Sequence, residues 1–406
     1  MAWGSTKSGR LLYNVAVVSA AALTLWLSFS VSVAHVYKDR QPTTSLGWWR
    51  SADALVAVGT ELVANGETAR APEVATMMRE ALAQTPVNPG AVRNLAVAEG
   101  LVGNANVSER LFRAGETLSR RDLQTQLWHI ESCVARDDIG CALTHYDRAL
   151  RTSLASRDIL LPVLVQAAEE PSVRQELLRL ISSKPSWRVP FLDQVADNSP
   201  NSEAVFRTLA GGQLDLADTA EQGLFVRALW RLIKINAYQH AFELYRTVRP
   251  PAAVNQLLRN GGFEAESAMG PFEWQFSEEP DLSATRVQSN DGEGETVLSL
   301  VADNGRGGSV ARQVLALTPG RYRLSFRTGN VSAEQAGQPL VELGCIGGVS
   351  LARMRAPLSV QSQTTSLMLE VPADKCAAQS FQISLGAAGT ASQPWIDAIE
   401  LAKIQN

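Results

Sequence analysis

The stretch LTPGRYRLSF, residues 317–326, decides the fold of the second half of this 406-residue chain. The residues TPG at 318–320 are typical of a turn, and side chains of alternating character follow over 321–326. Alternation with a period of two places successive side chains on opposite faces of a strand. The stretch therefore predicts a turn followed by a β-strand, with Tyr322 on the same face as Phe326.

Three other segments alternate in the same way, at 296–300, 366–370 and 381–385. The turn-forming residues DNG at 303–305 follow the first of them. Several short strands separated by turns predict an antiparallel β-sandwich or barrel. We assign this all-β domain to residues 256–406.

Three pieces of this domain resemble a known family. They are NGGFE at 260–264 with PFEW at 271–274, the stretch 317–326, and WIDAIEL at 395–401. In this order and spacing they resemble the jelly-roll carbohydrate-binding modules, whose fold is a galactose-binding-like sandwich. The resemblance implies a jelly-roll sandwich over 256–406 and a glycan, such as a polysaccharide, as its ligand.

The resemblance implies that sugar binds on a platform of aromatic rings, on which pyranose faces stack. The candidate rings are Phe272, Trp274, Tyr322 and Trp395. Trp274 is the preferred candidate because the residues around it are acidic or amide-bearing. The alternative for every ring is packing in the core, where most large aromatic side chains lie.

Glu264 and Asp397 match positions that resemble a structural calcium site in the same family. Two carboxylates with backbone carbonyls suit Ca²⁺, but exposed charges at strand ends are the alternative. No other cofactor is expected.

The four cysteines form one close pair in each half of the chain. Two local pairs are typical of an oxidising compartment, so we predict the disulfides Cys133–Cys141 and Cys345–Cys376. The first pair has an alternative. His129 precedes Cys133 by four residues and His145 follows Cys141 by four, which puts each His and Cys on one helix face and fits a tetrahedral zinc site.

Residues 46–255 have helical periodicity, with a faint repeat of about 34 residues. Ala142 and the segment YDRAL at 146–150 resemble the second helix of a tetratricopeptide repeat, and the likeness is clearest over 88–158. This resemblance implies a helical solenoid whose concave surface binds a partner protein. A generic helical bundle is the alternative.

The segment 11–36 begins with a long uncharged run and is long enough, as a helix, to cross a bilayer of about 30 Å. It predicts a transmembrane signal anchor in a bacterial inner membrane, with residues 1–10 as a cytoplasmic tail and the bulk of the chain in the periplasm. A cleaved signal peptide ending at Ser32-Val33-Ala34 is the alternative. Both interpretations export the rest of the chain.

The net charge of −4, without any run of five or more like charges, excludes a nucleic-acid partner. Motifs for a serine hydrolase elbow, a phosphate-binding loop or a zinc protease are absent, so we do not expect an enzyme. We expect a cell-envelope accessory or scaffold protein that binds glycan, in polysaccharide export or assembly. A protein–protein adaptor without a sugar site is the second hypothesis, and a polysaccharide-modifying enzyme with two carboxylates in one cleft is the third.

Overall fold

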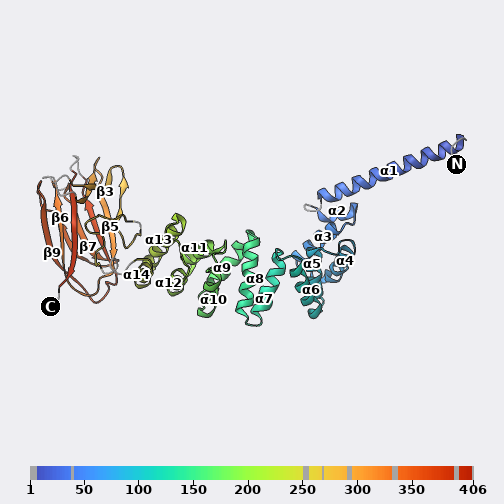
Figure 1. Ribbon diagram of the computed structural model, residues 1–406, viewed down its shortest axis with the longest axis horizontal. Helices are drawn as coiled ribbons and strands as arrows, with labels where there is room; N and C mark the ends of the chain where they lie inside the picture. The colour runs from blue at the N-terminus through green and yellow to red at the C-terminus, as the bar shows by residue number, and fades with distance from the viewer. Residues whose placement is uncertain are drawn as a thin grey trace. The chain divides into compact units, whose positions relative to one another are not determined.

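In a computed structural model, the chain is helical in its N-terminal part and forms an antiparallel β-sandwich in its C-terminal part, which confirms the predicted order of helices and then strands (Figure 1). Contacts divide it into a first unit, Met1–Leu160 with Pro185–Trp187, and a second unit, Leu161–Lys184 with Arg188–Asn406. The described residues are 7–37, 41–249, 256–267, 269–289, 295–331, 337–387 and 393–404. The predicted domain boundary at 255/256 borders residues outside these ranges, and residues 1–6 of the predicted tail also lie outside them.

Several of the shorter helices begin at residues that cap them. Asn88, Asp122 and Asp138 each accept a hydrogen bond from the backbone N–H three residues later, which satisfies one of the unpaired donors at a helix start. The helices are α1 (Lys7–Tyr37), α2 (Pro42–Trp48), α3 (Ala52–Ala64), η1 (Thr68–Arg70), α4 (Ala71–Gln84), α5 (Pro89–Leu101), α6 (Ala105–Leu118), α7 (Leu123–Val134), α8 (Ile139–Thr152), α9 (Ala155–Ala167), α10 (Pro171–Ile181), α11 (Arg188–Asn198), α12 (Ser202–Gly211), α13 (Thr219–Lys234) and α14 (Tyr238–Arg246).

Helices pack on their neighbours and on the next helix but one. In the first unit α3 contacts both α4 and α5, and α7 contacts α8. In the second unit α13 contacts both α11 and α14, and α12 contacts α14. Stacking of this kind is typical of helical solenoids, whose units contact only near neighbours.

The predicted transmembrane segment lies on α1. Across the residues that the structure describes, no helix has the length and apolarity needed to cross a membrane, so the predicted anchor is not supported. Side chains at 11–16, 34 and 35 of this segment are not among those described.

The β-sandwich consists of two antiparallel sheets. One has five strands in the order β1-β5-β10-β7-β8, and the other has six in the order β2-β3-β4-β11-β6-β9. The strands are β1 (Gln275–Phe276), β2 (Glu278–Glu279), β3 (Leu282–Gln288), β4 (Thr296–Ala302), β5 (Gly308–Leu315), β6 (Gly320–Gly329), β7 (Leu340–Cys345), β8 (Ser350–Arg355), β9 (Gln363–Val371), β10 (Gln379–Leu385) and β11 (Trp395–Lys403).

The core between the sheets comes from the alternation that the sequence shows. Tyr322, Leu324 and Phe326 of β6 all face inward and are buried, together with Phe381 and Ile383 of β10. The intervening residues of β6 and β10 point away from this core.

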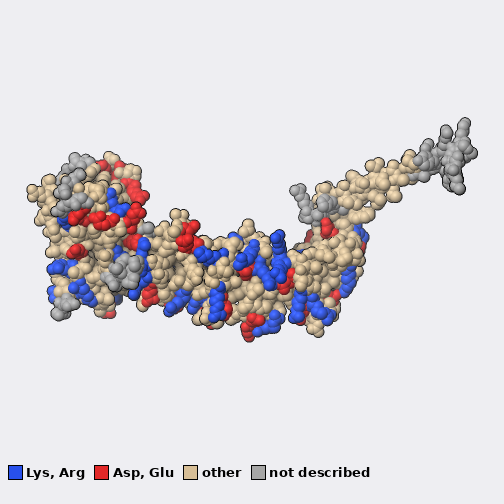
Figure 2. All heavy atoms as spheres, viewed as in Figure 1, with Lys and Arg blue, Asp and Glu red and all other residues tan. Residues whose placement is uncertain are grey.

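Charged side chains of both signs are interspersed over the helices on the face shown in Figure 2. Several form ion pairs at the surface, for example Arg70 with Glu73 and Arg50 with Glu80. Exposed pairs of this kind contribute at most about 1 kcal/mol each, so the helices depend on their apolar contacts for stability.

Candidate functional site

Polar side chains form a continuous row across the outward face of the five-stranded sheet. Gln275 on β1 is paired with Arg312 on β5, which is paired with Gln382 on β10. Gln382 is paired in turn with Glu342 on β7, and Glu342 with Arg353 on β8. Residues directly opposite each other in neighbouring strands share a face and lie close enough to interact. The register therefore assembles this cross-strand row from five separate strands.

Contacts within the row hold some of its groups and leave others available. Arg312 Nε donates to Gln275 Oε1 at 2.8 Å, and Gln382 Nε2 donates to Ser380 Oγ at 3.2 Å. Glu342 Oε2 lies 3.8 Å from Arg353 Nε. The two terminal amino groups of Arg312 form no hydrogen bond or ion pair with any part of the chain that the structure describes. The row thus presents both donors and acceptors.

Trp230 on α13 lies beside this row. Its indole is partly exposed, and the guanidinium carbon of Arg312 is 5.1 Å from the centre of its ring. Asp218 caps α13, and the apolar face of that helix, which includes Leu229 and Ile233, is buried. Trp230 lines a cavity of about 410 Å³ together with four members of the row, all but Arg353. The turn at Gly347-Gly348 also lines it.

A buried polar cluster connects α14 to the sandwich within the second unit. Glu273 Oε1 accepts hydrogen bonds from Tyr245 Oη at 3.0 Å and Arg249 Nε at 2.7 Å. The Arg259 guanidinium, 5% exposed as a residue, lies against the rings of Phe242, Tyr245 and Phe272. Burial lowers the pKa of Arg259 and raises the pKa of Tyr245 to about 12.

Three of the four rings predicted to stack on sugar belong to the interior. Trp274 is 2% exposed and packs against Phe263 and Phe381, and its indole N–H donates to the backbone oxygen of Asn260. Phe272 is buried in the α14 contact. Tyr322 is fully buried, and its hydroxyl donates to the Thr318 carbonyl at 2.6 Å. These rings are core residues, so the preference for Trp274 is corrected.

Trp395, the fourth ring, is partly exposed but belongs to the other sheet. It packs over Gly329, where a Cβ atom would collide with the indole. Arg327 covers it, with the guanidinium carbon 5.7 Å from the ring centre. The four predicted rings therefore do not gather on one exposed surface.

Glu264 and Asp397, the predicted calcium ligands, border one cavity of about 780 Å³. Glu264 accepts hydrogen bonds from the backbone N–H and the hydroxyl of Thr296, which lower the pKa of its carboxyl group. Asp397 is paired with Arg327, which also pairs with Glu295. Each carboxylate thus has a protein partner, and calcium binding stays a prediction.

Both predicted disulfides are present. Cys133–Cys141 joins α7 to α8, and Cys345 at the end of β7 is bonded to Cys376 in the loop before β10. The zinc site with two thiolates is excluded in this oxidised state, because both sulfurs of the first pair are used. His129 and His145 nevertheless lie together, with ring centres 4.5 Å apart.

Sequence reasoning missed the cross-strand row and Trp230. Arg312, Gln382 and Glu342 are the polar members of alternating strands, but their alignment depends on strand order and register. Trp230 lies on a helix whose periodicity indicates only core packing. The alternation of polar residues was the one signal that pointed to the outward face.

No protein-family model and no curated protein matches this sequence. The C-terminal β region is similar to several solved carbohydrate-binding modules. One is CBM4, at 19% identity over 36% of this chain and 99% of that chain, with a TM-score of 0.29. Another is a family 16 carbohydrate-binding module, at 17% identity over 36% of this chain and 100% of that chain, with a TM-score of 0.28.

A putative sugar-binding protein from Bacteroides thetaiotaomicron is also similar, at 14% identity over 37% of this chain and 100% of that chain, with a TM-score of 0.27. The chain covers only 22% of a bacteriophage CBA120 tailspike protein and 26% of an α-L-arabinofuranosidase that are also similar to it. The function proposed below follows from the cross-strand row and Trp230.

Proposed function

We propose that this protein binds a glycan in the cavity between Trp230 and the cross-strand row. Sugar hydroxyls need donors and acceptors at fixed positions, and the row offers Arg312 as donor, Glu342 as acceptor, and the amides of Gln275 and Gln382 as both. The indole supplies an apolar surface for pyranose C–H groups. The single observation that carries this proposal is the register that aligns these side chains beneath Trp230.

The cavity suits a segment of a sugar chain. Its volume of about 410 Å³ falls within the range of about 300–1,000 Å³ that is usual for small-molecule sites. One wall comes from a helix outside the sandwich, so the ligand would meet both parts of the second unit. The sandwich alone would bind more weakly than the full chain.

We propose a binding role without catalysis. Among the described residues that line this cavity, Glu342 is the one carboxylate. Glycoside hydrolysis needs two carboxyl groups that flank the scissile bond. The described lining therefore supports binding rather than hydrolysis.

The two disulfides support a location outside the cytoplasm, where such bonds persist. In that setting we propose an accessory or scaffold role in polysaccharide export or assembly. The solenoid-like contacts of α3 with α5 and of α11 with α13 favour a partner protein on the helical surface. An adaptor without sugar binding is the second candidate, favoured by the burial of the predicted stacking rings.

A glycan-array screen of the full chain tests the proposal. The full chain is required because α13 supplies Trp230. Arg312→Ala removes charge-assisted hydrogen bonds of about 1.5–3 kcal/mol, so binding should weaken roughly 10- to 150-fold. The matched control is Arg323→Ala, an exposed arginine on β6 of the other sheet, which should bind as the unmodified protein does. If no glycan binds the folded chain, the adaptor is favoured.

A further inference from the structure

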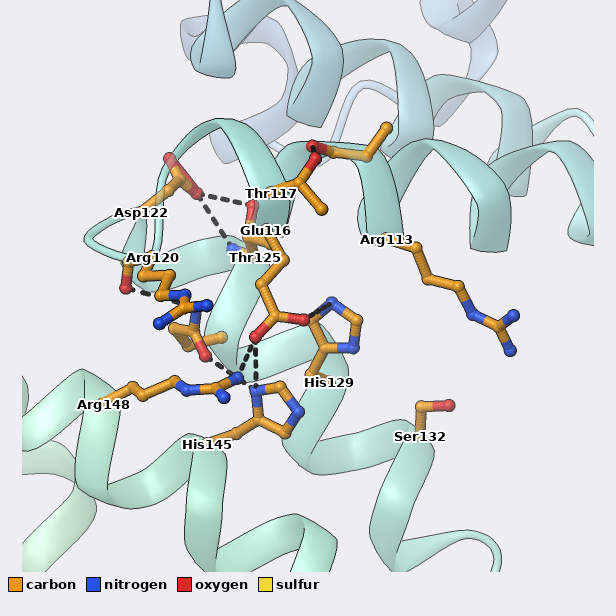
Figure 3. Close-up of polar contacts among 12 residues, drawn as sticks. Arg113, Glu116, Thr117, Arg120, Asp122, Thr125, His129, Ser132, His145 and Arg148 are labelled. Carbon is orange, nitrogen blue, oxygen red and sulfur yellow. Dashed lines mark hydrogen bonds and ion pairs between the residues drawn. The ribbon is translucent and has the colours of Figure 1, made fainter.

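A second cluster with ligand chemistry lies in the first unit, where α6, α7 and α8 meet. Figure 3 shows the carboxylate of Glu116, from α6, directed at His129 of α7 and His145 of α8. The caps Asp122 and Asp138 fix the starts of α7 and α8. The ligand atoms of the three residues all lie within 4.8 Å of one another.

Two distances in this cluster are close to those between neighbouring ligand atoms of a tetrahedral metal ion. Glu116 Oε2 is 3.5 Å from His129 Nε2, and Glu116 Oε1 is 3.6 Å from His145 Nδ1. Bonds of about 2.0–2.1 Å at tetrahedral angles place neighbouring ligand atoms about 3.3–3.5 Å apart. A cation at the centre would need only small side-chain movements.

One nitrogen is buried and lacks the partner that such an atom requires. His129 is 8% exposed, and its Nε2 forms no hydrogen bond within the described residues. The backbone carbonyl of Phe112 also acts on the His129 ring as a hydrogen-bond acceptor. With the ring proton on Nδ1, Nε2 directs a lone pair at the Glu116 carboxylate 3.5 Å away, and two acceptors that face each other favour a cation between them.

The second imidazole, His145, lies beside a polar partner as well as beside Glu116. His145 Nδ1 lies 2.7 Å from Gln126 Oε1 and would exchange that contact for the metal by carrying its proton on Nε2.

The surroundings hold the two rings together and also supply a competitor. The disulfide Cys133–Cys141 joins α7 to α8 one turn from the histidines. Arg148, with a side chain 31% exposed, forms an ion pair with Glu116 and so competes with a metal ion for this carboxylate. Metal binding at this site requires the arginine to turn outward.

We propose that Glu116, His129 and His145 bind one divalent transition cation, of which Zn²⁺ is the probe, with a fourth position open. Two imidazoles and one carboxylate are a ligand set that zinc uses. The disulfide contributes no ligand. This inference is independent of the glycan site, which lies in the other unit.

The test is a titration of the full chain, without a polyhistidine tag or reductant, with Zn²⁺ in competition with a chromogenic chelator. Reductant is omitted because free thiols would bind zinc themselves. We expect one equivalent bound, and at least tenfold weaker binding by His129→Gln and His145→Gln. The matched control is His240→Gln, which should leave zinc affinity unaltered. His240 lies in the other unit, where it pairs with Glu203 and is not part of the proposed metal site.

Two further measurements keep the test decisive if a histidine variant fails to fold. Arg148→Ala retains all three ligands and removes the competing cation, so its zinc affinity should rise severalfold. Co²⁺ in the unmodified protein should show the intense visible bands of a tetrahedral site without a thiolate charge-transfer band. No stoichiometric zinc, unaltered affinity in both histidine variants, or lower affinity in Arg148→Ala would overturn the proposal.

Discussion

Replacing Glu273 by alanine should detach α14 from the sandwich. Its carboxylate accepts hydrogen bonds from Tyr245 and Arg249, and from the backbone N–H of Met269 at 3.0 Å. It also lies close enough to the buried Arg259 to raise the pKa of that guanidinium, opposing the effect of burial. Breaking a buried ionic cluster by removing one partner costs about 3–5 kcal/mol, because it leaves uncompensated charge in the interior.

Hydrogen exchange measured by mass spectrometry is the suitable assay, because it reports the opening of α14 and β1 separately from the first unit. A loss of about 3 kcal/mol corresponds to exchange at least about a hundredfold faster over 238–246. The conservative variant Glu273→Gln should lose less, since it keeps one acceptor. The control is Glu370→Ala, an exposed position on β9. Exchange in Glu273→Ala within threefold of the unmodified protein would show that Glu273 does not hold α14 to the sandwich.

Three more outcomes are expected. In the folded protein, burial lowers the pKa of His145 from the usual 6.5 to about 4. Between pH 4 and pH 6.5 the unfolded state therefore binds more protons than the folded state. Unfolding free energy should therefore fall by up to about 3 kcal/mol from pH 7 to pH 4, and less in His145→Gln, as measured by urea titration. Cys345→Ser with Cys376→Ser opens a loop of 31 residues and should cost about 3.5 kcal/mol, seen as a lower melting temperature. Trp274→Ala should cost about 3–5 kcal/mol of stability in the same urea titration, while the folded fraction keeps its glycan affinity.

The fold was predictable where a local pattern fixes the burial of side chains. Period-two alternation around Tyr322 identifies the inward face of β6, because a one-residue shift would expose every apolar side chain. Helical periodicity over 46–255 likewise identified the helical part of the chain. In both cases neighbouring residues in the chain carry the whole signal.

The candidate site was not predictable because it depends on contacts between distant segments. Arg312 and Gln382 are neighbours only through strand pairing, and Trp230 reaches them from a helix. Trp274 looked exposed because its neighbours in sequence are polar, yet its partners in the core come from other strands. The four-residue spacing indicated that each histidine shares a helix face with its neighbouring cysteine. Glu116 was not predictable in this way, because it comes from a third helix.

The location of the glycan is the most direct test of the central claim. Hydrogen exchange would be compared with and without a saturating array-positive glycan, using the full chain. A glycan bound in the proposed site should slow exchange in Gly308–Leu315, Leu340–Cys345 and Gln379–Leu385, and in Thr219–Lys234 of α13. Protection confined to the six-stranded sheet, around Trp395, would contradict it.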